Sequence, residues 1–393
     1  MTEAERRGVR ASSPQAVTFV ELFFDLVFVF AVTQLTVLTA RDLTPEGIVR
    51  SILLGCLIWW AWTQFTWTLN PADTTHSVVR IVTLAATGAA LVMAASLPRA
   101  FAEDALWFAG PYIVVRALGL GLQIQVDLER VGASHAGVKT WAAMSSIGLV
   151  LVFVGAAVDP GDRSWAWFLA IVADLVAAAI AGRRTTWDLN PAHLSERHGL
   201  FVIIALGESL IVAGTAVAGD ERSAALASAA AGAILVACLL WWTYFGWLKE
   251  ALEHRISAAP VERMGSLARD AFSLAHFLII SGIVGFAVAI EEIAAHPAEP
   301  APAAVIAALG IGVALFVVSS ALSLRLLGGP VLVPRIAILV VMAILIVLVA
   351  PLPPVWPLVV VAGALTAIVL LEGPGHGLTG TAPHAGTPGQ GAG

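Results

Sequence analysis

The sequence predicts an all-α polytopic membrane protein with about 12 transmembrane helices. Of the 393 residues, 59% are hydrophobic and only 12% are charged, whereas charged residues make up roughly 25% of soluble domains. A helix that spans a bilayer needs about 20 apolar residues, so a chain of this length and composition can form about twelve. The apolar segments do not alternate with polar positions, which favours helices over barrel strands.

The same composition excludes several other classes of protein. A soluble multidomain protein would need a far more highly charged surface. The net charge of −6 weighs against a nucleic-acid binder, and two cysteines cannot form the disulfide framework of a small secreted domain. We therefore expect the lipid bilayer and an unknown small ion, small molecule or lipid substrate as partners, and no nucleic acid. The oligomeric state stays open.

Turn and charge signals divide the chain into apolar segments that are each long enough to span a membrane. The expected spans are 17–40, 47–69, 77–97, 105–126, 139–158, 163–183, 198–218, 224–248, 270–290, 302–327, 330–350 and 352–371. Only short Gly- or Pro-containing stretches separate the last three, so the number of helices after residue 300 is the least determined. The polar residues 1–16 precede a full-length span and are therefore not a cleavable signal.

The distribution of Lys and Arg predicts the orientation in the membrane. With twelve spans, fifteen of the 21 basic residues lie on or near the side of the N-terminus, five lie on the other side, and Arg116 lies within a span. Both termini are therefore predicted to be cytoplasmic. Only two of these residues are Lys, which together with the high Ala and Val content indicates a GC-rich bacterial genome. We expect a bacterial plasma (inner) membrane protein.

An internal repeat is predicted from two segments that lie 182 residues apart. Residues 52–60 and 234–242 are identical at six of nine positions, including a Cys and a Trp-Trp pair; chance matching of apolar segments is the alternative. An offset of 183 also places Asp25 against Glu208. Two repeats of six helices would have the same orientation in the membrane, as in parallel-repeat transporters.

This repeat predicts a division of the chain into five parts. The parts are a cytoplasmic N-terminal arm at 1–16, a first six-helix repeat at 17–183, a cytoplasmic linker and helix start at 184–197, a second six-helix repeat at 198–371, and a tail at 372–393. The tail is rich in Gly and Pro and cannot bury apolar area, so we expect it to be disordered.

Few ionisable side chains lie inside the expected spans, and each is a candidate for an ion, proton or substrate pathway. A charge in hydrocarbon costs at least about 2.5–3.5 kcal/mol, so such residues face the bundle interior and are functional candidates. The candidates are Glu21, Asp25, Arg116, Asp174, Glu208 and His276.

Glu21 and Asp25 are four residues apart and therefore share one helix face. Two carboxylates at this spacing are expected to titrate as a coupled pair, which suits proton binding. Alternatively, each could pair with Arg80, Arg116 or a helix N-terminus and only lock the bundle.

Two further candidates also have a structural interpretation. Arg116 needs an anionic partner, for which Asp25, Asp174 and Glu208 are candidates. It is either a structural counter-ion or a ligand contact. His276 near the start of its span fits a hydrogen-bonded core histidine.

The segment 188–209 combines a helix start with a polar face. Asn190-Pro191 is typical of a helix N-terminus, because Asn caps and Pro lacks only an N–H that would be unpaired there. His193, Glu196 and Arg197 then form a motif on one face near the cytoplasmic surface. Glu208 lies eleven residues after Arg197 and shares its face, about 16 Å deeper at 1.5 Å per residue. The tetrapeptide Leu-Asn-Pro-Ala occurs both at 69–72 and at 189–192.

No motif for catalysis, metal binding or cofactor binding is present. The spacing of His193, Glu196 and His198 matches no established zinc pattern, and nucleophile, phosphate-loop and dinucleotide fingerprints are absent from the sequence. We therefore expect no metal and no cofactor. Catalytic residues stay unknown, and an enzyme is the less favoured class.

The chain resembles the bacterial low temperature requirement A (LtrA) family. The resemblance rests on residues 20–29 (VELFFDLVFV), on His193, Glu196 and Arg197 with the Gly-Glu-Ser at 207–209, and on Ala-His-Phe at 275–277 followed by Ser-Gly-Ile at 281–283. It extends to about residue 371. It implies a polytopic bacterial membrane protein whose family name records a cold-growth phenotype. It implies no particular biochemical activity and no roles for the motif residues.

Three functions are consistent with these features of the sequence. The favoured hypothesis is a transporter or an ion or proton pathway that uses the buried carboxylates. The first alternative is a membrane-embedded enzyme that acts on a lipid or isoprenoid, and the second is a structural or sensory membrane protein linked to growth in the cold.

Overall fold

The computed structural model describes residues 8–372 except 103, 131–134, 182–186 and 219–222. All regular secondary structure in this part is helical, apart from an isolated backbone bridge between Arg10 and Ala72. The predicted tail and the predicted boundary at 183/184 lie outside the described residues. Glu372, which the sequence division assigns to the tail, is the last residue of a helix.

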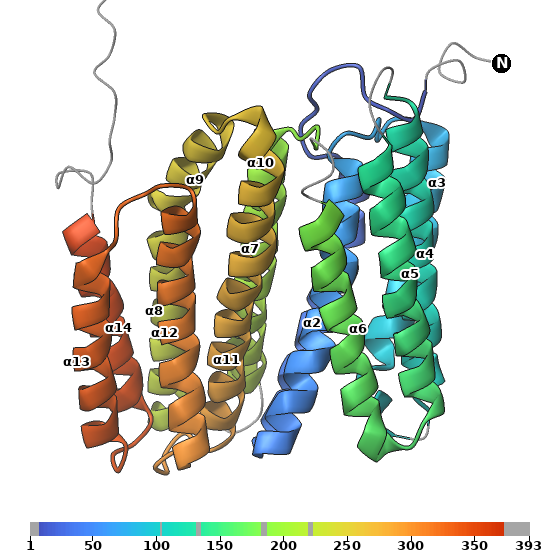
Figure 1. The fold of residues 1–393 in the computed structure, drawn as a ribbon. Helices are drawn as coiled ribbons and strands as arrows, with labels where there is room; N and C mark the ends of the chain where they lie inside the picture. The colour runs from blue at the N-terminus through green and yellow to red at the C-terminus, as the bar shows by residue number, and fades with distance from the viewer. Residues whose placement is uncertain (1–7, 103, 131–134, 182–186, 219–222, 373–393) are drawn as a thin grey trace, which may run out of the picture.

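Six long helices form the N-terminal half of the bundle (Figure 1). They are α1 (Phe19–Arg41), α2 (Pro45–Leu69), α3 (Ser77–Ala95), α4 (Leu106–Leu128), α5 (Ala136–Ala157) and α6 (Pro160–Ala181). A short 3₁₀ turn, η2 (Leu97–Arg99), joins α3 to the segment before α4.

The C-terminal half contains six more long helices and three short elements. They are α7 (Pro191–Ala218), α8 (Ala224–Phe245), α9 (Leu248–Ser257), α10 (Val261–Ala268), a π-helical turn η3 (Arg269–Leu274), α11 (Ala275–Ala295), α12 (Ala303–Leu326), α13 (Val333–Val349) and α14 (Val355–Glu372). Eleven helical segments of the described chain are long and apolar enough to cross a membrane, and α13 is apolar but shorter. The prediction of a polytopic all-α membrane protein is confirmed.

The helix boundaries agree with the start signals in the sequence. Asn190 precedes α7, which begins at Pro191, and its side chain accepts a 3.4 Å hydrogen bond from the backbone N–H of His193. Thr44 caps α2 in the same way, with a 3.2 Å bond from Gly47 N and a Pro at the first helical position. In both cases a side-chain oxygen pairs a backbone donor that the helix leaves free.

The neighbours of each helix follow the same order in the two halves. In the first half α1 packs on α3, α3 on α4, α4 on α5, α5 on α6 and α2 on α6. In the second half α7 packs on α11, α11 on α12, α12 on α13, α13 on α14 and α8 on α14. Helix α1 also contacts α7 and α11, so it joins the halves.

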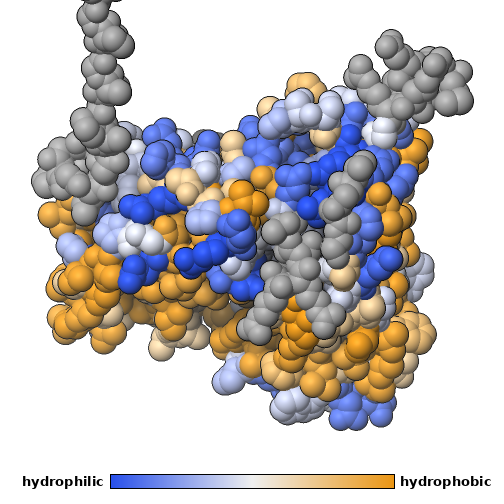
Figure 2. All heavy atoms as spheres, turned by 45° about the horizontal axis from the view of Figure 1, so that its top comes forward, coloured by the Kyte–Doolittle hydropathy of each residue, from blue (hydrophilic) through white to orange (hydrophobic). Residues whose placement is uncertain are grey.

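The N-terminal arm forms hydrogen bonds and an ion pair with several interhelical loops at one end of the bundle. The backbone N–H groups of Val9 and Arg10 donate to Glu129 at 3.0 and 2.9 Å, and Asp73 N donates to Val9 O at 2.7 Å. The guanidinium of Arg10 forms an ion pair with Asp188. The loops that follow α2, α4 and α6 therefore lie at the same end as the arm. Figure 2, with this end turned forward, shows hydrophilic side chains there and hydrophobic ones along the flanks.

The pKa of Asp73 shows that this loop is tightly hydrogen-bonded. Burial acts to raise the pKa of Asp73, but hydrogen bonds from Thr75 and Gln15 outweigh it and hold the pKa below its usual range. Because folding lowers this pKa, the contact stabilises the folded state above the unfolded pKa and is lost as the pH falls.

Helices α11 and α12 approach so closely that only glycine fits between them. A Cβ on Gly312 would lie 2.8 Å from Gly282 O and from Phe286 N, which are backbone atoms that cannot move aside. A Cβ on Gly310, on the same helix, would meet nothing closer than 3.7 Å. Small residues at such crossings let transmembrane helices pack by direct backbone contact.

We expect Gly312→Ala to destabilise the protein by about 1–3 kcal/mol, the usual cost of overpacking a tight contact, and to lower the thermal unfolding temperature in detergent. Gly310→Ala is the matched control and is expected to leave that temperature unchanged or slightly higher, because alanine favours the helix. Equal unfolding temperatures for the two variants would contradict this interpretation.

Candidate functional site

A buried cluster of charges joins α1 to α7. Arg197 of α7 donates from Nη1 to Glu21 Oε1 at 2.8 Å and from Nη2 to Asp25 Oδ1 at 2.6 Å. All three side chains are fully buried. The spacing of four residues on α1 places both carboxylates one above the other, so a single guanidinium reaches both. The predicted shared face of Glu21 and Asp25 is therefore what Arg197 contacts.

Two further side chains complete this cluster. The Nε2 of His193 lies 3.0 Å from Glu21 Oε1. The indole N–H of Trp62 in α2 donates to Asp25 Oδ1 at 2.7 Å. We call Glu21, Asp25, Trp62, His193 and Arg197 the α1–α7 cluster.

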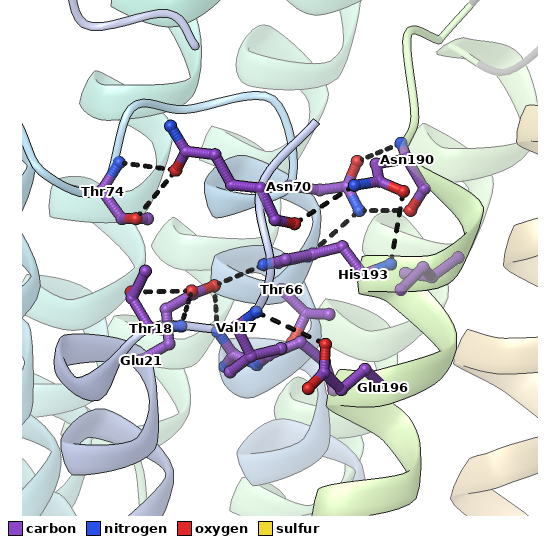
Figure 3. A network of polar contacts seen from close by, with 12 residues as sticks. Val17, Thr18, Glu21, Thr66, Asn70, Thr74, Asn190, His193 and Glu196 are labelled. Atoms are coloured by element: carbon purple, nitrogen blue, oxygen red, sulfur yellow. Dashed lines mark hydrogen bonds and ion pairs between the residues drawn. The ribbon is translucent and has the colours of Figure 1, made fainter. Parts of the chain in front are cut away.

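The two copies of the Leu-Asn-Pro-Ala tetrapeptide lie next to the cluster, on its side toward the end of the bundle. The Asn70 side chain donates to Asn190 O at 2.9 Å and accepts from Asn190 N at 2.7 Å. The two Leu-Asn-Pro-Ala segments thus bind each other and hold the start of α7 against the end of α2. Figure 3 shows this pair directly beside His193 and Glu21.

The asparagine pair favours one tautomer of His193. Because Asn70 Oδ1 accepts from a backbone N–H, its Nδ2 is the atom that faces His193 Nδ1, at 3.3 Å. An amide NH₂ only donates, so this contact favours the tautomer in which Nδ1 accepts and the hydrogen lies on Nε2, toward the Glu21 carboxylate. In this tautomer the His193 ring is neutral.

The α1–α7 cluster consequently has one negative charge in excess. It contains two carboxylates, one guanidinium and a neutral histidine. Burying an unbalanced charge is costly, and removal of one partner from a buried pair is strongly destabilising. Asp25 Oδ2 is buried and has no hydrogen-bond partner among the described residues. This oxygen is the free position at which one positive charge can be added.

A pair of histidines in edge-to-face contact lies beside the cluster. The His198 ring contacts Trp62 and His276, with ring centroids 5.1 Å apart in both cases. His276 bonds Ala271 O through Nδ1 at 2.8 Å and the Tyr244 hydroxyl through Nε2 at 2.7 Å, as expected for a satisfied core histidine. The π-helical turn η3 frees the Ala271 carbonyl for this bond.

Glu208 faces α1 farther along the membrane. Its carboxylate accepts a hydrogen bond from the hydroxyl of Thr33. Because Arg197 and Glu208 both reach α1, the predicted polar face of α7 is the face that packs on that helix. Thr33 follows Asp25 by eight residues, or about 12 Å along α1.

Arg116 and Asp174 form a separate ion pair that ties α4 to α6. The guanidinium donates to both oxygens of Asp174, at 2.9 and 3.0 Å, and to the Tyr112 hydroxyl at 2.9 Å. Ser145 of α5 donates to the same carboxylate at 2.9 Å. Of the three partners considered for Arg116, Asp174 is the one the structure shows. The charges balance, and Arg116 is a counter-ion that holds the bundle.

Glu196 is not part of the buried cluster. Its carboxylate accepts a 3.4 Å hydrogen bond from Val17 N, just before α1 begins. Of the predicted site residues, the structure brings together Glu21, Asp25, His193 and Arg197. His276 contacts the His198 ring, which lies beside the cluster. Arg116 and Asp174 lie apart from the cluster, on α4 and α6.

Sequence reasoning missed several buried polar groups. The sequence places Arg335 near the edge of a span and Glu372 in the tail, yet both are buried and form a bidentate pair at 2.6 and 2.7 Å between α13 and α14. The sequence also places Arg163 at the edge of a span, near the membrane surface, yet its guanidinium is buried and donates to Gly155 O near the end of α5 and to Ala102 O before α4. Each lies at a helix end, where the sequence alone cannot distinguish an exposed charge from a buried one.

The fold and the buried charges define a polytopic helical membrane protein with a polar site at a helix–helix contact inside the bundle. The chain belongs to the family described as bacterial low temperature requirement A protein (LtrA), whose model matches residues 16–370. An uncharacterised protein of Rhizobium meliloti (strain 1021) is 28% identical over 298 residues, covering 71% of this chain and 70% of that protein. No solved structure is significantly similar.

The Arg116–Asp174 pair provides a test of a purely structural role. We expect Asp174→Leu or Arg116→Leu alone to destabilise the protein by about 3–5 kcal/mol, because each leaves one buried charge unpaired. The double variant is expected to recover most of this loss, measured by thermal unfolding in detergent. A double variant as unstable as the single ones would contradict the assignment.

Proposed function

We propose that this protein is a proton-coupled transporter and that the α1–α7 cluster binds the proton. The observation that carries the proposal is the charge imbalance of that cluster. With His193 neutral, one added proton makes the cluster neutral, which is the favourable state for a buried group. The proton binds at Asp25 Oδ2, the cluster oxygen without a donor.

The geometry favours a proton over a metal cation. A cation such as Ca²⁺ or Mg²⁺ needs about six or more oxygen ligands. Here the other carboxylate oxygens of the cluster accept bonds from Arg197, His193, Trp62 and the Thr18 backbone N–H. A single free oxygen can hold a proton but cannot coordinate a metal ion.

The route beyond Asp25 requires a movement of the protein. Glu208 and Thr33 form the next polar pair along α1, about 12 Å farther on. The buried Phe28 lies between these positions on α1, and the tilted ring of Phe24 packs against it with ring centroids 5.0 Å apart. Because this stretch has no polar bridge among the described side chains, proton passage would accompany a rearrangement of α1 against α7. That property belongs to carriers rather than to open channels.

The repeat is part of the same proposal. The two halves share one order of helix neighbours, and the motif at 52–60 recurs at 234–242. An offset of 183 pairs Asp25 with Glu208 in the sequence, whereas in the structure Asp25 contacts Arg197 and Glu208 contacts Thr33, so the two carboxylates lie at different depths. Transporters built from repeats commonly place their coupling sites at the contact between the repeats. The positive-inside distribution supports cytoplasmic termini in a bacterium and a position of the α1–α7 cluster on the cytoplasmic side of the plasma membrane.

A second candidate function is a lipid- or isoprenoid-modifying enzyme, favoured by a large apolar cavity. The cavity has a volume of about 540 Å³ and lies between α1, α2, α7, α11 and α12. Its wall is almost entirely apolar, and Trp59, Phe201 and Phe277 line part of it. The Trp59 ring lies 6.0 Å from His198, whose Nε2 has no partner among the described residues and could act as a base. Identical lipid profiles of cells with and without the protein would contradict this candidate.

We expect Asp25→Asn to reduce proton uptake by proteoliposomes, driven by a pH gradient and followed with an enclosed pH-sensitive dye, to the level of protein-free vesicles. The amide has the shape of the protonated acid but cannot release a proton. Glu208→Gln is expected to have the same effect. The control is Glu250→Gln, which changes an exposed carboxylate on α9 outside the α1–α7 cluster. Unchanged uptake in both Asp25→Asn and Glu208→Gln would overturn the proposal.

The proposal also makes a spectroscopic prediction about the resting protein. Infrared difference spectra are expected to show the carbonyl band of a protonated carboxylic acid that disappears in Asp25→Asn and also weakens in Glu21→Gln, because loss of the Glu21 charge leaves Arg197 to pair with an ionised Asp25. If the band is retained in Asp25→Asn, the proton does not bind at Asp25.

A further inference from the structure

A small cavity lined by four tryptophans lies between α2, α4, α5, α6 and the start of the α10–α11 helix. Trp60 and Trp67 reach it from α2, Trp141 from α5, and Trp187 from the segment before α7. Its volume is about 50 Å³, room for a few non-hydrogen atoms, since a single water needs about 10–15 Å³ on this measure. None of these residues belongs to the α1–α7 cluster, so the cavity is independent of the proposed proton site.

Three polar atoms on the wall of this cavity are buried and have no partner among the described residues. They are Trp60 Nε1, Thr63 Oγ1 and Gln64 Oε1, and all three residues lie on one face of α2. Buried polar atoms in proteins are normally hydrogen-bonded, and each exception requires an explanation. Thr63 and Gln64 are 5% and 4% exposed, so bulk solvent does not provide the partner.

Other tryptophans of the wall are held by hydrogen bonds or by close packing. Trp67 donates to the Ser273 hydroxyl and Trp141 to Gln123 Oε1, both at 2.9 Å. Trp187 packs on Gly265, where a Cβ would lie 2.7 Å from the indole, so glycine is required for this contact. The π-helical turn η3 supplies Ser273 and Arg269, and π-helical turns are frequent at functional sites.

The unpaired atoms specify the chemistry of an occupant. Trp60 N–H needs an acceptor, Gln64 Oε1 needs a donor, and the Thr63 hydroxyl can pair with either. Four electron-rich indoles favour a cation, because the face of an aromatic ring attracts positive charge. Arg269 is the charged residue on the described wall, and Asp270 neutralises it at 2.7 Å. The cavity therefore favours a small cation that carries both an N–H donor and an oxygen acceptor.

We propose that this tryptophan cavity binds a small ammonium alcohol of the ethanolamine type. The ammonium donates to Gln64 Oε1 and Thr63 and is surrounded by the indoles, and the hydroxyl accepts from Trp60 N–H. The free amine carries both groups, and the headgroup of an ethanolamine phospholipid carries the same ammonium with a phosphate ester oxygen as the acceptor in place of the hydroxyl. The experiment must separate these two sources.

The test is equilibrium binding of radiolabelled ethanolamine to the purified protein in phosphatidylglycerol nanodiscs. We expect saturable binding. Ethylammonium lacks the acceptor and choline lacks the N–H donor, so each is expected to compete about tenfold more weakly, the effect of one lost buried hydrogen bond. Ethylene glycol lacks the charge and is expected not to compete. No saturable binding, or equal competition by ethylene glycol, would overturn the proposal and leave ordered water as the occupant.

The variants test the individual contacts. Trp60→Phe keeps a ring but removes the N–H, so it is expected to weaken ethanolamine binding about tenfold and to abolish the preference for ethanolamine over ethylammonium. The matched control is Trp242→Phe, because Trp242 is the counterpart of Trp60 in the repeated motif but is 58% exposed. Thr63→Val, which changes only a hydroxyl, is the second variant, and thermal unfolding checks that each variant folds. Unaltered binding in both Trp60→Phe and Thr63→Val would place the ligand elsewhere.

Repeating the measurement in phosphatidylethanolamine nanodiscs separates the two sources. If the lipid headgroup occupies the cavity, binding of free ethanolamine is lost in these nanodiscs but retained in phosphatidylglycerol. If the free amine is the ligand, binding is the same in both. Trp60→Phe is expected to weaken either form of binding.

Discussion

The cost of a charge inside the bilayer is the constraint on which this structure depends. Each buried charge needs an opposite charge or hydrogen-bonding partners within the protein, because no water is present to solvate it. Arg197 with Glu21 and Asp25 joins α7 to α1, Arg116 with Asp174 joins α4 to α6, and Arg335 with Glu372 joins α13 to α14. These contacts fix which faces of neighbouring helices meet and in which register. The apolar helix surfaces specify this only weakly, because they resemble the surrounding lipid.

Much of the fold and part of the site could be predicted from local sequence patterns. Length and apolarity predict the spans, the Asn-Pro pair predicts where α7 begins, and spacing along a helix predicts which carboxylates share a face. Partners across helices could not be predicted in this way. Arg197 was placed near the cytoplasmic surface, yet it is fully buried, because α7 starts at Pro191 and the Asn70–Asn190 pair covers it. The family motifs contain the right residues but say nothing about which ones touch.

Identical residues in the motif at 52–60 and its copy at 234–242 lie in different environments. Trp59 and Trp60 lie inside the first half, where Trp59 donates to Ser273 O at 2.6 Å, whereas Trp241 and Trp242 are 43% and 58% exposed on the flank of α8. The two halves therefore keep a common helix order while their interiors differ. A matching sequence in apolar helices indicates related architecture, and the hydrogen bonds of each copy must be established separately.

The three buried ion clusters differ in one respect that bears on mechanism. Arg116 with Asp174 and Arg335 with Glu372 each match one cation to one carboxylate, so adding a proton would create an excess charge and is unfavourable. The α1–α7 cluster matches one cation to two carboxylates, so adding a proton removes an excess charge. This cluster also lies where the two halves meet. Any displacement of α1 along α7 must therefore break or remake the bonds of Arg197. In the proposed mechanism the ease of this step depends on whether Asp25 carries its proton, so that protonation and helix movement are coupled through the same guanidinium.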